Sequence, residues 1–230
     1  MSIQSISNTP GASNIHRTPI AVLLVDDHPA VRVGARKLID DQPDMRVVAE
    51  ARSAEEAVQK ADIRVDVAVV DYHLADGRDG LWVTAGLKRL EQPPQVLLYT
   101  AFADNALAVM AQIAGADGLL DKRELGPGLC STIRRLAGGQ QHLPAIRSPL
   151  VQVLRSRLSP RDQAIFGMLV HGTPPDLIVE RLGITHDELR ARRSAMLRSL
   201  RHGRRAAGFP SDGHPLDYER ARRNVRRPAA

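Results

Sequence analysis

Short apolar runs alternate with segments of helical spacing between residues 20 and 138, and no other feature of the chain restricts its fold as strongly. The runs lie at about 20–25, 46–50, 65–70, 95–100 and 117–121. Between them apolar residues recur at helical spacing, as at Val31, Ala35, Leu38 and Ile39. Repeated β-α units of this kind predict a doubly wound, five-stranded parallel sheet of the α/β class.

Polar residues stand where four of these runs end. Asp26 and Asp27 follow the first run, Asp71 follows the third, Thr100 ends the fourth and Lys122 follows the fifth. The carboxyl ends of parallel strands meet at one sheet edge, so these side chains are expected to converge there. Closely spaced carboxylates resist ionisation unless a cation joins them, and Mg²⁺ is the usual cation where phosphate is also bound. The pattern therefore predicts a Mg²⁺ site and phosphoryl chemistry.

Composition limits the kind of core this chain can form and the cellular location expected for it. With 43% hydrophobic and only 3% aromatic residues, the chain can bury a core, but that core must be aliphatic. No stretch approaches the roughly 18 consecutive apolar residues of a membrane span, and the N-terminus lacks the pattern of a secretory signal. A cytoplasmic location with no membrane partner is expected. The lone Cys130 is predicted to be a small helix residue rather than a metal ligand.

Charge divides the chain into an acidic and a basic part. Residues 1–138 carry 15 Lys and Arg against 18 Asp and Glu, a net of −3, whereas residues 139–230 carry 17 against 8, a net of +9. Every cation of the second part is arginine. Such asymmetry indicates an acidic module joined to one that meets a polyanion.

Local composition and turn residues set the predicted boundaries. A Ser-, Asn- and Thr-rich leader at 1–19 and a basic tail at 203–230 are expected to be disordered. Between them we expect an α/β domain at 20–138, a Gly- and Pro-containing linker at 139–157 and a small all-α domain at 158–202.

Repeated helix-start signals support the all-α domain. Ser159, Thr173 and Thr185 each precede an acid by three residues, as in a capping box, and the first two are followed by proline. Gly172 and Gly183 mark helix ends. Short helices with tight turns in an arginine-rich segment are typical of a helix-turn-helix unit.

The motifs of both parts are similar to those of known families. Residues 20–138 resemble a receiver domain in Val25-Asp26-Asp27-His28-Pro29, Asp71 with Asp79-Gly80, Thr100-Ala101 and Gly118-Leu-Leu-Asp-Lys122. Residues 158–200 resemble a LuxR-type helix-turn-helix in Leu158-Ser-Pro-Arg-Asp162, Gly172, Arg181-Leu-Gly-Ile184 and Leu197 to Leu200. In this order the two parts resemble a response regulator of the NarL/FixJ type.

This resemblance implies a role for each residue of the sheet edge. Asp71 would take a phosphoryl group from a sensor histidine kinase, and Asp26 and Asp27 with Asp71 would hold Mg²⁺. Thr100 and Lys122 would contact phosphate oxygens and report the modification. The chain departs from the family at Ala75, where a proline is usual, and at Leu119, where an aromatic residue is common.

In the basic part, the resemblance places a DNA-reading helix after Thr185. Leu189, Met196 and Leu200 form its predicted buried stripe, which leaves Arg190, Arg193 and Ser194 on the outward face for DNA contact. Glu188 stands where threonine is common, and we expect its charge to be used at the N-terminus of this helix.

The expected function is a transcription regulator switched by phosphorylation, acting on double-stranded DNA and homodimeric when phosphorylated. It is not expected to be an enzyme. A phosphoreceiver adaptor that acts through protein contacts stays open. A phosphotransfer or phosphatase enzyme is disfavoured, because His73 replaces a further acid two residues after Asp71 and no phosphate-cradling loop occurs.

Overall fold

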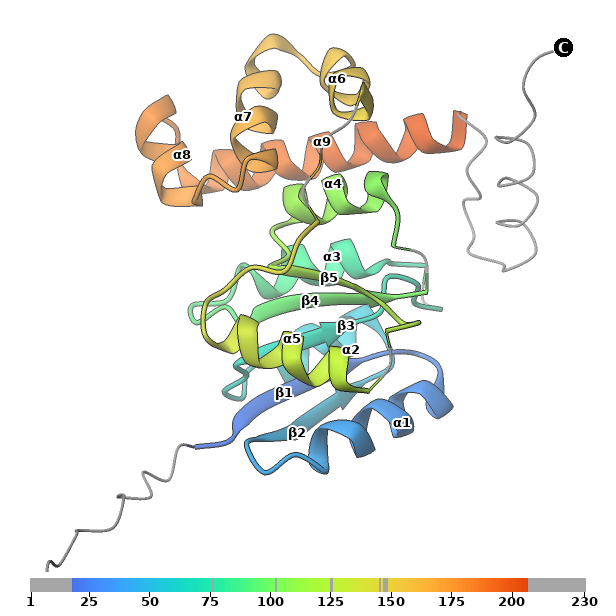
Figure 1. Cartoon of the computed structure of the whole chain (residues 1–230). Coiled ribbons are helices and arrows are strands. Elements are labelled where there is room, and N and C mark those ends of the chain that lie inside the picture. The colour runs from blue at the N-terminus through green and yellow to red at the C-terminus, as the bar shows by residue number, and fades with distance from the viewer. Residues whose placement is uncertain are drawn as a thin grey trace, which may run out of the picture.

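The chain forms a parallel sheet covered by helices on both faces, with further helices packed on one side (Figure 1). It is seen in a computed structural model that describes residues 18–75, 77–101, 103–124, 126–144, 146 and 149–206. The strands are β1 (Ile20–Val25), β2 (Met45–Ala51), β3 (Val67–Val70), β4 (Gln95–Thr100) and β5 (Gly118–Asp121). Their order is β2-β1-β3-β4-β5 and every pairing is parallel, which confirms the predicted doubly wound sheet.

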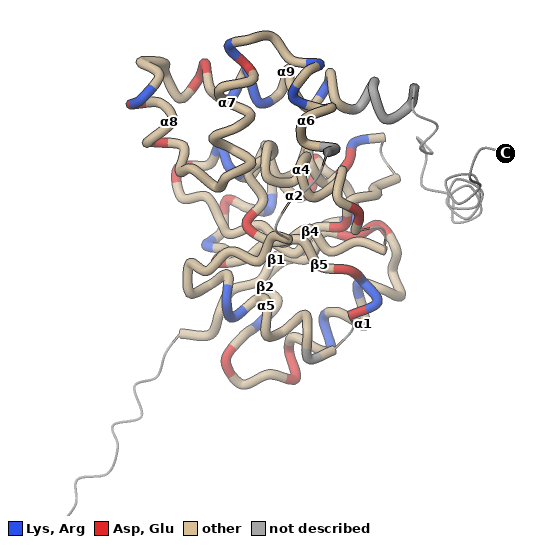
Figure 2. The backbone as a smooth tube through the Cα atoms, turned by 45° about the horizontal axis from the view of Figure 1, so that its top comes forward, with Lys and Arg blue, Asp and Glu red and all other residues tan. Residues whose placement is uncertain are grey.

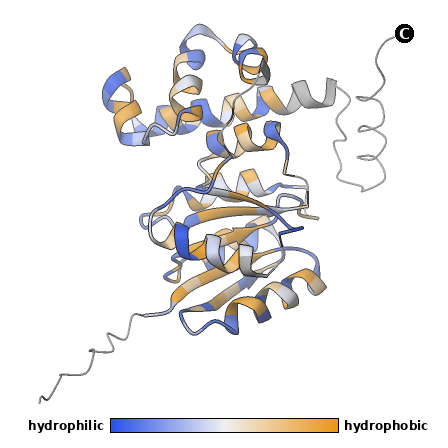
Figure 3. Ribbon diagram, in the orientation of Figure 1, coloured by the Kyte–Doolittle hydropathy of each residue, from blue (hydrophilic) through white to orange (hydrophobic). Residues whose placement is uncertain are grey.

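Two separate hydrophobic clusters cover the faces of the sheet. Helices α1 (Pro29–Asp40) and α5 (Pro127–Ala137) cover one face, where Leu24 packs with Ile39 and Ile133. Helices α2 (Ala54–Lys60), α3 (Gly80–Leu87) and α4 (Asn105–Ala114) cover the other, where Leu23 belongs to a second cluster. The inner strands β1 and β3 lie between these two clusters and are continuously apolar (Figure 3), whereas the edge strand β2 also carries Arg46 and Glu50.

Side-chain caps fix the starts of three helices around this sheet. Ser53 accepts a hydrogen bond from the backbone N–H of Glu56 at 3.2 Å, as predicted for α2. Asp79 caps α3 through Trp82 N at 3.0 Å, and Asp104 caps α4 through Leu107 N at 2.6 Å. These caps satisfy helix N–H groups that have no intrahelical partner, so the loops after β3 and β4 are anchored where the helices begin.

Four helices follow: α6 (Pro149–Ser156), α7 (Pro160–Val170), α8 (Pro175–Leu182) and α9 (His186–Ala206). Helix α6 lies inside the segment 139–157 that was expected to be a linker, and α9 continues beyond the predicted boundary at residue 202. Ser159 caps α7 as predicted, but Pro174 rather than Thr173 occupies the N-cap position of α8. The expected disorder falls largely on residues 1–17 and 207–230, which lie outside the described residues.

The C-terminal helices rest on α4. Both α7 and α9 contact this helix, and α9 runs across it in Figure 1. Buried residues of α7 and α9, including Phe166 and Met196, belong to the same hydrophobic cluster as Leu107 of α4. The α2/α3/α4 side of the sheet is therefore continuous with the C-terminal core, whereas the cluster on the α1/α5 side is separate.

A pair of glycine substitutions tests the close packing of α3 against the sheet. A Cβ added at Gly80 would lie 2.4 Å from the backbone oxygen of Asp71 and 2.9 Å from Leu98 Cδ2, so Gly80→Ala forces the start of α3 away from β3. We expect urea denaturation to show a loss of about 1–3 kcal/mol in unfolding free energy. Gly34→Ala, in the middle of α1 with nothing within 4 Å, is the matched control and should gain about 0.5–1 kcal/mol. Equal changes in the two variants would contradict the close approach at Gly80.

Candidate functional site

Asp26, Asp27 and Asp71 meet at the carboxyl edge of the sheet, as the sequence predicted. Together with His28 they offer ligand atoms that all lie within 4.8 Å of one another. Backbone hydrogen bonds at the strand ends hold two of them at this edge: Asp26 N donates to Ala51 O at 3.1 Å, and Asp71 N donates to Val25 O at 2.8 Å. The carboxylates of Asp26 and Asp71 are buried, whereas Asp27 is partly exposed.

Lys122 bridges the two buried carboxylates. Its Nζ lies 2.7 Å from Asp26 Oδ2 and 2.6 Å from Asp71 Oδ2. The backbone N–H of Lys122 donates to Thr100 O at 2.8 Å, which ties the ends of β4 and β5 together. Thr100 is fully buried at the same edge of the sheet. The structure thus brings four of the predicted residues into direct contact or ligand distance and places Thr100 beside them through the backbone.

The electrostatics of this cluster favour an added cation. Burial raises the pKa of Asp71 above its ordinary value. Lys122 lowers this pKa, and repulsion from Asp26 raises it, so the net shift is upward. Oδ1 of Asp27 is buried and, among the described residues, has no hydrogen-bond partner. His28 Nδ1 lies 2.8 Å from this oxygen, without hydrogen-bond geometry. An unsatisfied carboxylate oxygen beside two further carboxylates is a donor set of the kind that suits Mg²⁺.

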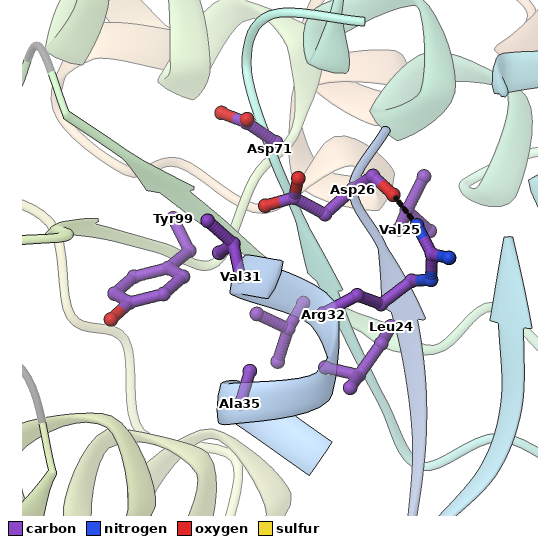
Figure 4. Close-up of a pocket in the computed structure, with 9 residues that line it drawn as sticks. Leu24, Val25, Asp26, Val31, Arg32, Ala35, Asp71 and Tyr99 are labelled. Atoms are coloured by element: carbon purple, nitrogen blue, oxygen red, sulfur yellow. Dashed lines mark hydrogen bonds between the residues drawn. The ribbon is translucent and has the colours of Figure 1, made fainter. Parts of the chain in front are cut away.

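A small pocket beside the acids has one lining residue whose role the sequence did not suggest. Figure 4 shows Asp26 and Asp71 above a floor formed by Val31, Ala35 and Tyr99. Arg32 lines the same pocket and its Nη1 donates to the backbone oxygen of Asp26 at 2.7 Å. Sequence spacing gave no signal for this contact, because it depends on how α1 turns back over the end of β1.

The predicted DNA-contacting residues all lie on α9, but they do not form one solvent-exposed face. Arg190 pairs with Asp187, and both Arg190 and Ser194 are half-buried. Arg193 is different, because its side chain reaches the receiver part of the chain: a Cβ added at Gly115 would lie 3.4 Å from both of its terminal nitrogens. The expectation that Arg193 points outward is therefore wrong for this arrangement, since α4 packs against that side of α9.

The local environment of Arg193 is unfavourable for a charge. Burial lowers its pKa to about 10, and the nearby Asp117 opposes this shift. Its Nε is buried with no hydrogen-bond partner in the part of the chain that the structure describes. Asp117 is itself engaged by Lys88 Nζ at 2.6 Å and by Val96 N at 2.7 Å. Arg193 is thus held between the two parts by packing more than by ion pairing.

Glu188, the unexpected acid of α9, is used within the C-terminal helices. Its N–H donates to Thr185 Oγ1 at 3.1 Å, which confirms Thr185 as a helix cap. Its carboxylate lies 3.1 Å from Arg192 Nε and 3.0 Å from Arg161 Nη2. Arg192 also reaches Asp162 at 2.9 Å, so this network joins α7 to α9. Figure 2 shows positive and negative positions interspersed along these helices.

Comparisons with known proteins place the chain in a family. Residues 22–134 match the family model of the response regulator receiver domain. The response regulator UvrY of Escherichia coli is 31% identical over 196 residues, covering 80% of this chain and 89% of that protein. The chain belongs to the NarL/FixJ-type two-component response regulators. The nitrate/nitrite response regulator NarL of Escherichia coli is 27% identical over 198 residues, covering 81% and 91% of the two chains.

A solved structure agrees with this assignment. A LuxR-family two-component response regulator from Aurantimonas sp. SI85-9A1 superposes with a TM-score of 0.52 at 31% identity, covering 59% of this chain and 94% of that one. The predicted receiver fold is confirmed. Within the described residues, none of the helices combines the length and hydrophobicity needed to cross a bilayer.

The pKa of Asp71 gives a stability test. The raised pKa means that the native state binds this proton more tightly than the unfolded chain does, so wild-type stability falls as pH rises from the unfolded value of 3.8 through the native value. Without added metal, Asp71→Asn should therefore unfold at a higher temperature than wild type at pH 7. We expect the difference to shrink as the pH is lowered toward 3.8, as measured by circular dichroism.

Added Mg²⁺ is the control for this test. Mg²⁺ should raise the midpoint of the wild type more than that of Asp71→Asn, because a ligand stabilises the state that binds it. A pH-independent difference, or equal responses to Mg²⁺, would contradict the electrostatic description of the site.

Proposed function

We propose that this response regulator accepts a phosphoryl group on Asp71 from a sensor histidine kinase and that the modification controls DNA binding by its C-terminal helices. The observation that carries the proposal is the Lys122 bridge to Asp26 and Asp71 at 2.7 and 2.6 Å. A buried nucleophilic carboxylate, two further acids and a cation at one sheet edge form the set of groups that phosphoryl transfer requires.

The transfer step uses these residues in distinct roles. An oxygen of Asp71 attacks phosphorus as the P–N bond to the kinase histidine breaks, and the bonding electrons return to the imidazole ring. Asp26, Asp27 and Asp71 would hold Mg²⁺, which when bound offsets negative charge on the transferring group. Lys122 pairs with a phosphate oxygen in place of the Asp71 carboxylate, and the Thr100 hydroxyl donates to another.

The packing of α9 on α4 supports a route from this site to DNA. Thr100 lies at the end of β4, and α4 begins at Asn105, so a change around Thr100 acts on the start of the helix that carries α7 and α9. Phosphorylation shifts the chain toward a state in which α9 leaves α4 and Arg193 becomes available to a polyanion. Two freed units then bind paired half-sites as a homodimer.

A phosphoreceiver adaptor is the second candidate, and the placement of Arg193 favours it. This arginine contacts the receiver part, and Glu188 contributes negative charge on the same helix. In this alternative, phosphorylation exposes α9 and α4 for a protein partner. In either case Asp71 retains one phosphoryl group per chain, and the protein does not turn over phosphate esters.

The deciding experiment compares wild type with Asp71→Asn in acetyl phosphate and Mg²⁺. We expect one phosphoryl group per wild-type chain and none on the variant. Selection of genomic fragments should then enrich DNA only with phosphorylated wild type, and binding should weaken with salt because arginines displace counterions from phosphates. Labelling without any DNA enrichment would favour the adaptor, and equal labelling of both proteins would refute Asp71 as the acceptor.

Hydrogen exchange tests the release of α9 separately. Backbone amides of α4 and α9 should exchange faster after phosphorylation of the wild type, because their shared interface opens, while those of β1 and β3 should not change. Asp71→Asn treated in the same way is the control. Unchanged protection of α4 and α9 in a phosphorylated, DNA-bound sample would show that these helices stay together.

A further inference from the structure

Arg32 contacts the backbone of Asp26, at the start of the segment Asp26–His28, from helix α1. The strand β1 ends at Val25, so the backbone oxygen of Asp26 lies beyond the strand, and the guanidinium of Arg32 supplies its donor at 2.7 Å. Figure 4 draws this bond as a dashed line between the side chain from α1 and the end of β1. The contact fixes the peptide plane between Asp26 and Asp27, and therefore the direction in which Asp27 leaves the strand.

Glu50 on β2 holds the guanidinium in place. Nε of Arg32 donates to Glu50 Oε2 at 3.0 Å, and Glu50 is also bound by Arg36 from the next turn of α1. Arg32 is well covered, with 16% of its side chain exposed, whereas Arg36 is 50% exposed. A planar guanidinium can bond a carboxylate and a carbonyl oxygen at the same time, which the point charge of a lysine does less well.

We propose that Arg32 is a positioning residue for the metal site: through the Asp26 carbonyl it orients Asp27 so that a carboxylate oxygen of Asp27 stays within 4.8 Å of the other ligand atoms. This inference rests on the proposed function, because it concerns the cation that phosphoryl transfer uses. Asp26 is otherwise held at its N–H by Ala51 and at its carboxylate by His28 N and Lys122. The remaining polar group of Asp26 is its backbone carbonyl, which belongs to the peptide group that joins Asp26 to Asp27.

The direction of the change in metal affinity distinguishes an orienting role of Arg32 from an effect of its charge alone. Arg32 is a cation close to a cation site, so removing its charge alone would strengthen metal binding. Removing a residue that orients a ligand instead weakens binding, by about 10-fold or more in metal sites where such outer contacts have been changed. The two explanations therefore predict opposite shifts in the same measurement.

The test measures Mn²⁺ binding to the full-length, unphosphorylated chain by the electron paramagnetic resonance signal of free Mn²⁺. Arg32→Gln should raise the dissociation constant by about 10-fold. Arg36→Gln is the matched control, because Arg36 shares Glu50 and the α1 surface but has no contact with Asp26, and its affinity should match wild type. Glu50→Gln should fall between them, and Arg32→Lys should recover part of the loss.

A kinetic readout accompanies the binding data. With acetyl phosphate as donor, Arg32→Gln should need more Mg²⁺ for half-maximal labelling of Asp71, while the rate at saturating Mg²⁺ stays near that of wild type. Unchanged or tighter Mn²⁺ binding by a variant that unfolds at the wild-type temperature would overturn the inference. If Arg32→Gln is unstable, Arg32→Lys carries the test: it keeps the charge, so weaker Mn²⁺ binding than wild type supports positioning and unchanged binding overturns it. Failure of wild type itself to bind Mn²⁺ would instead refute the metal site of the proposed function.

Discussion

The ammonium of Lys122 between two buried carboxylates is the interaction on which the rest of the site depends. Desolvation opposes the charge on Asp71, and Asp26 adds repulsion, so the two acids cannot stay close and ionised without a cation between them. Lys122 supplies it from the position after β5, and its backbone N–H donates to Thr100 O, which ties the ends of β4 and β5 together. In the proposed mechanism, a phosphoryl group on Asp71 would bring oxygens that compete for the same ammonium, so the ends of β3, β4 and β5 would respond together.

The two faces of the sheet differ in what packs against them. The α1/α5 face closes on its own hydrophobic cluster, with Tyr99, Ile39 and Ile133 packed inside it. The opposite face shares one cluster with α7 and α9, and α4 lies between the sheet and these helices. Leu119, which stands where the family often has an aromatic residue, belongs to that shared cluster. In the proposed mechanism, a rearrangement at the ends of β4 and β5 would alter the contacts with α7 and α9 through α4.

The sequence was informative for most features that local rules decide, although Pro174 rather than Thr173 occupies the N-cap position of α8. The strand positions, the Ser53, Ser159 and Thr185 caps, and the convergence of the acids and Lys122 follow from short-range pattern plus parallel pairing. The environment of Arg193 could not be read in this way, because it depends on docking between segments about 80 residues apart in sequence, and helical periodicity reports only that a face is polar. The Arg32 contact lies within one segment, but it was missed because it depends on how α1 turns back over the end of β1. Helix α6 was missed because Pro149 and the glycines before it resemble linker composition.

The burial of Arg193 also affects the stability of the closed state, in which α9 packs on α4. Its Nε is buried without a partner among the described residues, and a group of this kind costs about 1–3 kcal/mol. That penalty offsets part of the apolar packing between α4 and α9, so the closed state is less stable than an all-apolar interface of the same size. In the proposed mechanism this matters, because moving an equilibrium from mostly closed to mostly open needs about 5.5 kcal/mol of differential stabilisation. Arg193 contributes to that difference in both states: it is poorly solvated while α9 packs on α4, and it pairs with DNA phosphate once α9 is released.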